Sequence, residues 1–203
     1  GTAFLEETAR VGDLAGVIGP LGSIQLLHEV ATRYPRVPIV EQALFDLPDR
    51  LLIMTEGGLP TEVTERGVTP TDVRLMASAW NRDFVLLAPQ SPLAPLAGLR
   101  LAVGLHQLGA HGRAALWAAR IRAASPDHPL TDRLLYVEGL ALSAERDHRS
   151  ARRALRQVSR DAFAHDDGTR DRSVLQADAS LALARIREAR GDTQGAVEAY
   201  GST

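Results

Sequence analysis

Apolar residues along this chain recur at helical spacing, and several such stretches end at a proline. The tetrapeptide Pro-x-x-Pro occurs three times, beginning at Pro35, Pro89 and Pro126. Apolar residues stand at the same distances before each first proline. Nine residues earlier are Leu26, Trp80 and Trp117. Five residues earlier are Val30, Phe84 and Ile121. Because proline cannot continue a helix but suits the first turn of one, each tetrapeptide predicts that one helix ends and the next begins. Docking of these prolines to an SH3-type domain is the weaker interpretation, since their flanks are helical.

The spacing of similar segments indicates an internal repeat. Pro89 and Pro126 are 37 residues apart, and the same step leads from Ala102 to Gly139. A step of 45 residues then leads from Gly139 to Ala184. The extra residues fall in the segment SRDAFAHDDGTRDRS, which we expect to be a polar connection. Small residues at these positions would let two helices approach closely, and a larger side chain there would overpack the contact.

The pattern predicts an all-α chain in a single helical repeat domain over residues 1–203, with almost no strand. Each helix pair alone would expose an apolar face, which stacking against the neighbouring pairs buries. Gly1 in place of Met leads us to expect a processed or excised segment, and further repeats or domains beyond 1–203 stay open. The predicted antiparallel pairs are 3–16 with 21–34, 38–55 with 70–87, 92–108 with 111–124, 130–145 with 148–160, and 172–190 with 193–203.

Residues 56–72 interrupt the repeat. The interval from Pro35 to Pro89 is 54 residues, 17 more than the next one, and the excess is rich in glycine and proline. This composition predicts an inserted loop rather than a helix, and a loop of this length in a compact domain is typical of a functional or a disordered segment. Thr69 followed by Pro70 predicts the start of the next helix. The loop residues that we expect to contact a partner are Leu59, Glu62, Glu65 and Arg66.

The small and apolar residues at these intervals resemble the tetratricopeptide repeat. The first copy has Ala102, Gly109, Ala114 and Pro126; later copies have Gly139, Ala151 and Val158, and then Ala184, Gly191, Ala196 and Tyr200. The resemblance implies an α-solenoid of about five helix pairs in a right-handed superhelix. The linker from Tyr34 to Pro38 most resembles bacterial envelope proteins of the Tol-Pal-associated and outer-membrane lipoprotein types, which implies a periplasmic or envelope-associated location.

In the resembled family, the first helix of each pair lines a concave groove that binds a protein partner. A mixture of apolar and arginine positions suits an extended peptide or a partner helix. The variant of this groove that captures acidic C-terminal peptides would need Lys and Asn at these positions, so we do not predict that ligand. The residues that the resemblance places in the groove are Leu99, Arg100, Val103, His106, Gln107, Arg133, Tyr136, Val137, Leu140, Asp178, Leu181, Arg185 and Glu188.

Composition removes several classes of function. All 23 basic residues are Arg, and Cys is absent. The sequence therefore has no Walker-type or Schiff-base lysine, no thiolate metal site and no cysteine nucleophile. A formal charge of −2 provides no long-range field for nucleic acid, and no apolar run approaches the ~20 residues that span a membrane. We expect no catalytic residue, no cofactor and no bound metal.

Three polar features invite other interpretations. His106 and His111 flank a turn with poor metal-ligand spacing, and we expect His28, His128, His148 and His165 to lie at the surface or at helix ends. The run HDDGTRD at 165–171 lacks the acidic spacing of a calcium loop. The arginine-rich run 149–160 could contact phosphate or RNA, but a solvated outer face of a helix is the favoured interpretation, with Ala151, Ala154, Leu155 and Val158 inward.

The sequence therefore predicts a non-catalytic protein–protein interaction scaffold that binds its partner through the groove and the 56–72 loop. Two alternatives stay open. The chain could be a structural accessory subunit of a larger, membrane-bound complex, or the helical regulatory arm of a multidomain enzyme.

Overall fold

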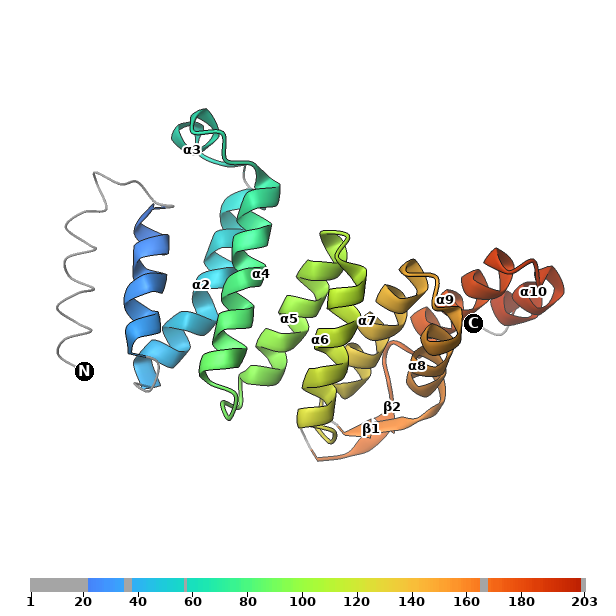
Figure 1. The fold of residues 1–203 in the computed structure, drawn as a ribbon. Helices are drawn as coiled ribbons and strands as arrows, with labels where there is room; N and C mark the ends of the chain where they lie inside the picture. Colours follow the sequence, from blue (N-terminus) through green and yellow to red (C-terminus); the bar gives the residue numbers. More distant parts are fainter. Residues whose placement is uncertain (1–21, 35–37, 57, 165–167, 202–203) are drawn as a thin grey trace. The chain divides into compact units, whose positions relative to one another are not determined.

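A computed structural model describes residues 22–34, 38–56, 58–164 and 168–201 (Figure 1). In this part of the chain the fold is all-helical apart from one short two-stranded sheet, and no helix is long and apolar enough to cross a membrane. The chain divides into two compact units, Gly1–Ala97 and Gly98–Thr203. The predicted helix 3–16 lies outside the described residues.

The helices begin and end within four residues of their predicted bounds, except for one short helix that was not predicted. Neighbouring helices along the chain pack against each other from α6 to α10, and α2 packs against α4. The helices are residues 22–33, α2 (Pro38–Glu56), α3 (Thr61–Glu65), α4 (Pro70–Leu87), α5 (Ala94–Gln107), α6 (His111–Ala124), α7 (Thr131–Ala144), α8 (His148–Arg160), α9 (Gln176–Ala189) and α10 (Thr193–Gly201).

The turns between the helices of a pair repeat at the predicted intervals of 37 and 45 residues. Gly109, Arg146 and Gly191 occupy equivalent positions, with φ of 77°, 63° and 79°. This left-handed conformation lets the following amide bond back to the last turn of the helix. The equivalent N–H···O=C bonds run from Ala110 to Leu105 (2.9 Å), from Asp147 to Leu142 (3.0 Å) and from Asp192 to Arg187 (3.0 Å).

The starts of three helices repeat at the same intervals. Ser91, His128 and Ser173 each use a side-chain acceptor to bind the backbone N–H two residues ahead, which belongs to a leucine in every case. This local bond holds the turn that leads into α5, α7 and α9. Pro92 and Pro129 lie inside this turn, so the prediction that they open the helix is wrong. Pro38 does begin α2, as predicted.

The first unit buries one apolar cluster among α2, α3, α4 and the helix over residues 22–33. Leu51 and Val73 are fully buried there, and Trp80 is 7% exposed. The ring of His28 stacks on Trp80 with 4.1 Å between centroids and an interplanar angle of 7°. The expectation that His28 lies at the surface is therefore wrong, since the histidine completes an aromatic contact inside the core. Burial lowers its pKa to about 4, against a weaker opposite effect of Asp83.

The 56–72 segment is not a simple loop. It contains the short helix α3, which lies at the end of the α2–α4 pair in Figure 1. Val63 of α3 is buried in the core of the first unit, with Leu59 and Val68 packed beside it. Thr69 and Asp72 form a reciprocal capping box at the start of α4, as the Thr-Pro pair predicted. The glycines and prolines obscured α3, whose stability comes from burying Val63 rather than from its own length.

The second unit contains a hairpin that the sequence analysis did not predict. Strands β1 (Ala162–Ala164) and β2 (Arg170–Arg172) pair antiparallel in the segment expected to be a polar connection. Phe163 of β1 is buried in the core cluster with Leu155, Val158 and Ile186. Residues 170–172 form a strand, so α9 begins at Gln176 rather than at 172. Strands of three residues leave no periodic signal, which explains why the pattern missed them.

Gly139 marks the tightest contact between α7 and α8. A β-carbon at this position would lie 2.6 Å from Leu155 Cγ and 2.9 Å from its Cδ2. Equivalent repeat positions carry alanine at 102 and 184, both fully buried. The α7–α8 pair is therefore packed closely enough that a β-carbon at residue 139 would require Leu155 to move.

Replacing Gly139 with alanine tests this contact. We expect Gly139→Ala to lower the free energy of unfolding by about 1–3 kcal/mol, because the new methyl group displaces Leu155 from a filled core. Gly112→Ala is the control, since the nearest atom to its β-carbon is 3.6 Å away. Urea unfolding of both variants measures the difference. Gly139→Ala should cost less free energy of unfolding when Leu155 is already replaced by alanine, because the side chain it displaces is then absent. The close contact would be contradicted if this cost were unchanged, or if Gly139→Ala and Gly112→Ala had equal effects.

The His28–Trp80 stack predicts a pH dependence. Between about pH 6.5 and 4 the unfolded chain protonates His28 while the folded protein does not, so the free energy of unfolding should fall as the pH is lowered. His28→Phe keeps a flat ring against Trp80 but cannot titrate. Urea unfolding at several pH values should therefore show a smaller fall for the variant than for the wild type. Parallel curves would exclude burial of a neutral His28 as the cause.

Candidate functional site

The predicted groove residues on α5 lie along its partly exposed side. Arg100, Val103 and His106 are half-buried and Gln107 is exposed, while Leu101 and Leu105 of the same helix pack against Ala114 and Ala141 in the core. These four residues therefore lie outside the core. Leu99, by contrast, is 8% exposed and belongs to the interior.

The predicted residues of α7 and α9 meet. Burial raises the pKa of Tyr136, the nearby carboxylate of Asp178 raises it further, and the guanidinium of Arg185 opposes the shift. These side chains therefore interact across the contact between α7 and α9. Glu188 accepts a hydrogen bond of 3.0 Å from the hydroxyl of Tyr200. Leu140 packs at the edge of the core and stays partly exposed.

Val137 does not belong to this face. It is 8% exposed and counts among the buried residues of α7. Successive side chains on an α-helix point about 100° apart, so Val137 faces inward although its neighbour Tyr136 is partly exposed. Arg133 is exposed, as predicted.

A depression borders the α7–α9 face at the turn between α7 and α8. It has a volume of about 570 Å³. The side chains of Arg146, His148 and Arg185 line it, and the buried Nδ1 of His148 has no hydrogen-bond partner. Arg185 thus belongs both to the predicted face and to the depression, which it lines with Arg146 and His148.

The predicted contacts of the 56–72 segment divide into two kinds. Leu59 packs against the core of the first unit, so its side chain is held by the fold rather than presented fully to a partner. Glu65 and Arg66 are exposed at the end of α3. The side chain of Glu62 lies outside the described part of the molecule.

His106 and His111 are closer than their spacing suggested, with 3.0 Å between the two Nδ1 atoms. Burial lowers the pKa of His106, and the neighbouring His111 lowers it further. Such a pair supplies two ligands at most. Among the described residues, no group of three or more His, Asp or Glu side chains lies close enough to hold a metal ion.

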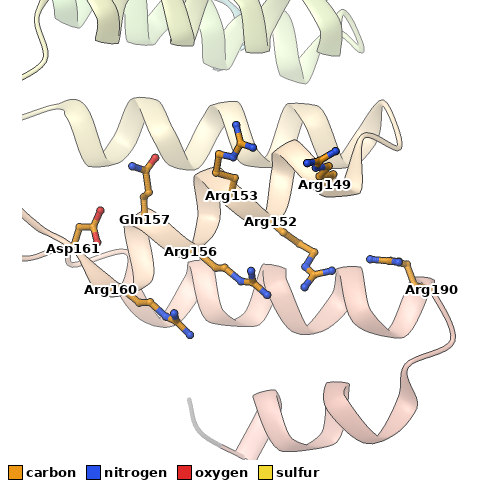
Figure 2. Close-up of a pocket in the computed structure, with 8 residues that line it drawn as sticks. All are labelled: Arg149, Arg152, Arg153, Arg156, Gln157, Arg160, Asp161 and Arg190. Atoms are coloured by element: carbon orange, nitrogen blue, oxygen red, sulfur yellow. The ribbon is translucent and has the colours of Figure 1, made fainter.

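A surface that the sequence analysis set aside is the most strongly charged in the second unit. The arginine surface consists of Arg149, Arg152, Arg153, Arg156 and Arg160 of α8 together with Arg190 from the end of α9 (Figure 2). These residues line a depression of about 640 Å³ with Gln157 and Asp161. The predicted buried face of α8, Ala151, Ala154, Leu155 and Val158, is confirmed. The remaining positions do not form a plain convex face, because Arg190 at the end of α9 borders the depression beside α8.

The arginine surface brings six positive charges together with few acids beside them, namely Asp161 in the lining of the depression and Asp147 near Arg149. None of the ion pairs formed among the described residues involves its six arginines. Burial lowers the pKa of Arg156, and the neighbouring charges of Arg152, Arg160 and Arg187 lower it further. The run RSARRALRQVSR is the sequence signal that could have identified this site, whereas the contribution of Arg190 appears only in the fold.

A comparison with models of known protein families finds no match for this chain, and no curated protein matches its sequence. Two surfaces of the second unit have the geometry and chemistry of binding sites. One is the mixed face that α7 and α9 share, and the other is the arginine surface.

Removing one charge from the arginine surface should stabilise the fold. We expect Arg156→Gln to raise the free energy of unfolding by about 0.5 kcal/mol at low ionic strength, because like charges four residues apart on a helix repel. The gain should disappear at about 0.5 M salt, where the repulsion is screened. Arg113→Gln on α6 removes a charge outside the cluster and should have little effect. Urea unfolding at both salt concentrations measures this, and a gain that persists at high salt would contradict the electrostatic origin.

Proposed function

We propose that the chain is a non-catalytic protein-binding domain built from helix-pair repeats of the tetratricopeptide type. The repeated left-handed turns at 109, 146 and 191 support the repeat. The partner segment binds on the face that α7 and α9 share, and the observation that carries this proposal is the packing of α7 against α9, which brings Asp178 and Arg185 near enough to influence the pKa of Tyr136. The predicted residues of α5 extend the same surface within the second unit.

The chemistry of the α7–α9 face suits a protein segment. Tyrosine and arginine supply large contact areas with polar ends, and they are the residue types enriched at the energetic centres of protein interfaces. Leu140 and Leu181 add partly exposed apolar area beside them. The face offers Asp178 as an acceptor and Arg185 as a donor, so a partner backbone or a charged side chain finds a counterpart of either sign.

The depression beside Arg185 adds an anchor point. A partner side chain that enters it would reach the side chains of Arg146 and Arg185. An acidic side chain would gain a charge-assisted hydrogen bond from either arginine. The exposed end of α3, with Glu65 and Arg66, is a separate contact proposed for the first unit.

Site-specific photo-crosslinking tests this function in the full chain. A photoreactive residue at position 140 should crosslink to one protein partner in an extract of the source organism, and the same residue at the exposed Leu116 should not. With the purified partner, Arg185→Ala should weaken binding about tenfold or more, as expected for the loss of a central arginine contact. Equal crosslinking at both positions, or binding that is insensitive to Arg185→Ala, would contradict the α7–α9 face as the site.

A further inference from the structure

The arginine surface is ordered along the axis of α8. Arg152, Arg156 and Arg160 follow one another at intervals of four residues, which places them about 6 Å apart along one side of the helix. In Figure 2 Arg152 and Arg156 extend toward α9, and Arg190 approaches from the end of that helix. Arg152, Arg156 and Arg160 thus form a row rather than a point, with Arg149, Arg153 and Arg190 around it. A single small anion would reach only part of the row, because its ends are about 12 Å apart.

The arrangement is unfavourable in the free protein. The pKa of Arg156 is lowered by burial and by the charges of Arg152, Arg160 and Arg187, and Asp161 is the one acid among the residues that line the depression. A polyanion placed along the row would replace repulsion by several charge-assisted hydrogen bonds, and guanidinium groups bind carboxylates in a bidentate manner. Binding a polyanion therefore also relieves the repulsion among the arginines, which raises its affinity. A neutral ligand gains nothing from this effect.

The chemistry of the lining favours carboxylates on a polypeptide over nucleic acid. Proteins that bind single strands interleave arginines with aromatic side chains on which bases stack, and the residues that line this depression include no aromatic one. The charge of the whole chain is −2, which gives no extended field to hold a phosphate backbone. Carboxylates four residues apart on an acidic helix are also about 6 Å apart, which matches the spacing of the row.

The distribution of charge along the chain directs an acidic partner to this place. Residues 1–97 hold 12 Asp and Glu against 7 Arg, whereas residues 98–203 hold 13 against 16. The first unit therefore repels an acidic segment, and the excess of arginine in the second unit is concentrated on α8. Electrostatic complementarity of this kind raises association rates and selects against other partners.

We propose that the arginine surface of α8 and α9 is a second binding site, distinct from the α7–α9 face, and that it binds an acidic segment of a partner protein. Helical or extended, that segment presents Asp or Glu side chains at about 6 Å intervals to Arg152, Arg156 and Arg160. Arg149, Arg153 and Arg190 complete the positive rim.

Fluorescence anisotropy with the full chain and a labelled polyglutamate peptide of about 12 residues tests the site. The combined variant Arg152→Gln, Arg156→Gln and Arg160→Gln should weaken binding at least about tenfold, since each lost arginine contact to a carboxylate removes a charge-assisted bond. The matched control removes the same charge from exposed positions elsewhere, through Arg50→Gln, Arg74→Gln and Arg113→Gln. It should keep the wild-type affinity within about twofold. Replacing the three arginines with lysine should give an intermediate loss, because charge is retained without bidentate geometry.

A single-stranded oligonucleotide of equal charge is the competing probe. We expect it to bind more weakly than the peptide, and equal or tighter binding would overturn the assignment to an acidic protein segment. If the control variant lost as much affinity for the peptide as the arginine variant, the effect would be one of total charge and the proposed site would be overturned. The absence of peptide binding at about millimolar concentration would overturn it as well. Thermal unfolding shows that the variants are folded. Crosslinking from position 140 should be unchanged in the arginine variant, so failure of this proposal is distinguishable from failure of the proposed function.

Discussion

One residue in the left-handed backbone region closes the turn between the helices of each pair in Gly98–Thr203. The reversal brings the second helix directly against the first, so the size of the side chain at the contact decides how closely they pack. At Gly139 that distance leaves no space for a β-carbon beside Leu155. Arg146 adopts the same conformation without the freedom of glycine. Packing of α7 and α8 on either side therefore maintains a conformation that costs a non-glycine residue about 1–2 kcal/mol.

This packing decides where the charges of α8 go. Ala151, Leu155 and Val158 must face the core, so the arginines between them share the remaining side, where Arg190 from the end of α9 joins them. Charge repulsion in such a cluster opposes stability and persists where function benefits from it. The α7–α9 face differs in kind, because one acid, Asp178, and one arginine, Arg185, both act on Tyr136 there. The two surfaces therefore suit partners of different chemistry on the same unit.

Helix bounds were predictable because their signals are local. Thr69 and Asp72 cap α4 with bonds that need no distant partner, and the glycines at 109 and 191 suit the left-handed turn directly. The largest of the errors involve contacts between distant residues. His28 became a core residue by stacking on Trp80, and α3 formed by burying Val63 against α2 and α4. Burial of Phe163 in the core of the second unit anchors the short hairpin of β1 and β2. No period in the sequence reports such contacts.

The sequence by itself determined the all-helical class, the repeat intervals of 37 and 45 residues and the inward face of α8, because each follows from spacing within a few turns of chain. It also located the five arginines of α8 in the arginine surface. Only the tertiary structure decided that these arginines line a depression and that Arg190 from the end of α9 joins them. It likewise decided that Tyr136, Asp178 and Arg185 meet while Val137 turns inward. Side chains from separate helices become neighbours through packing, which the pattern along one helix does not specify.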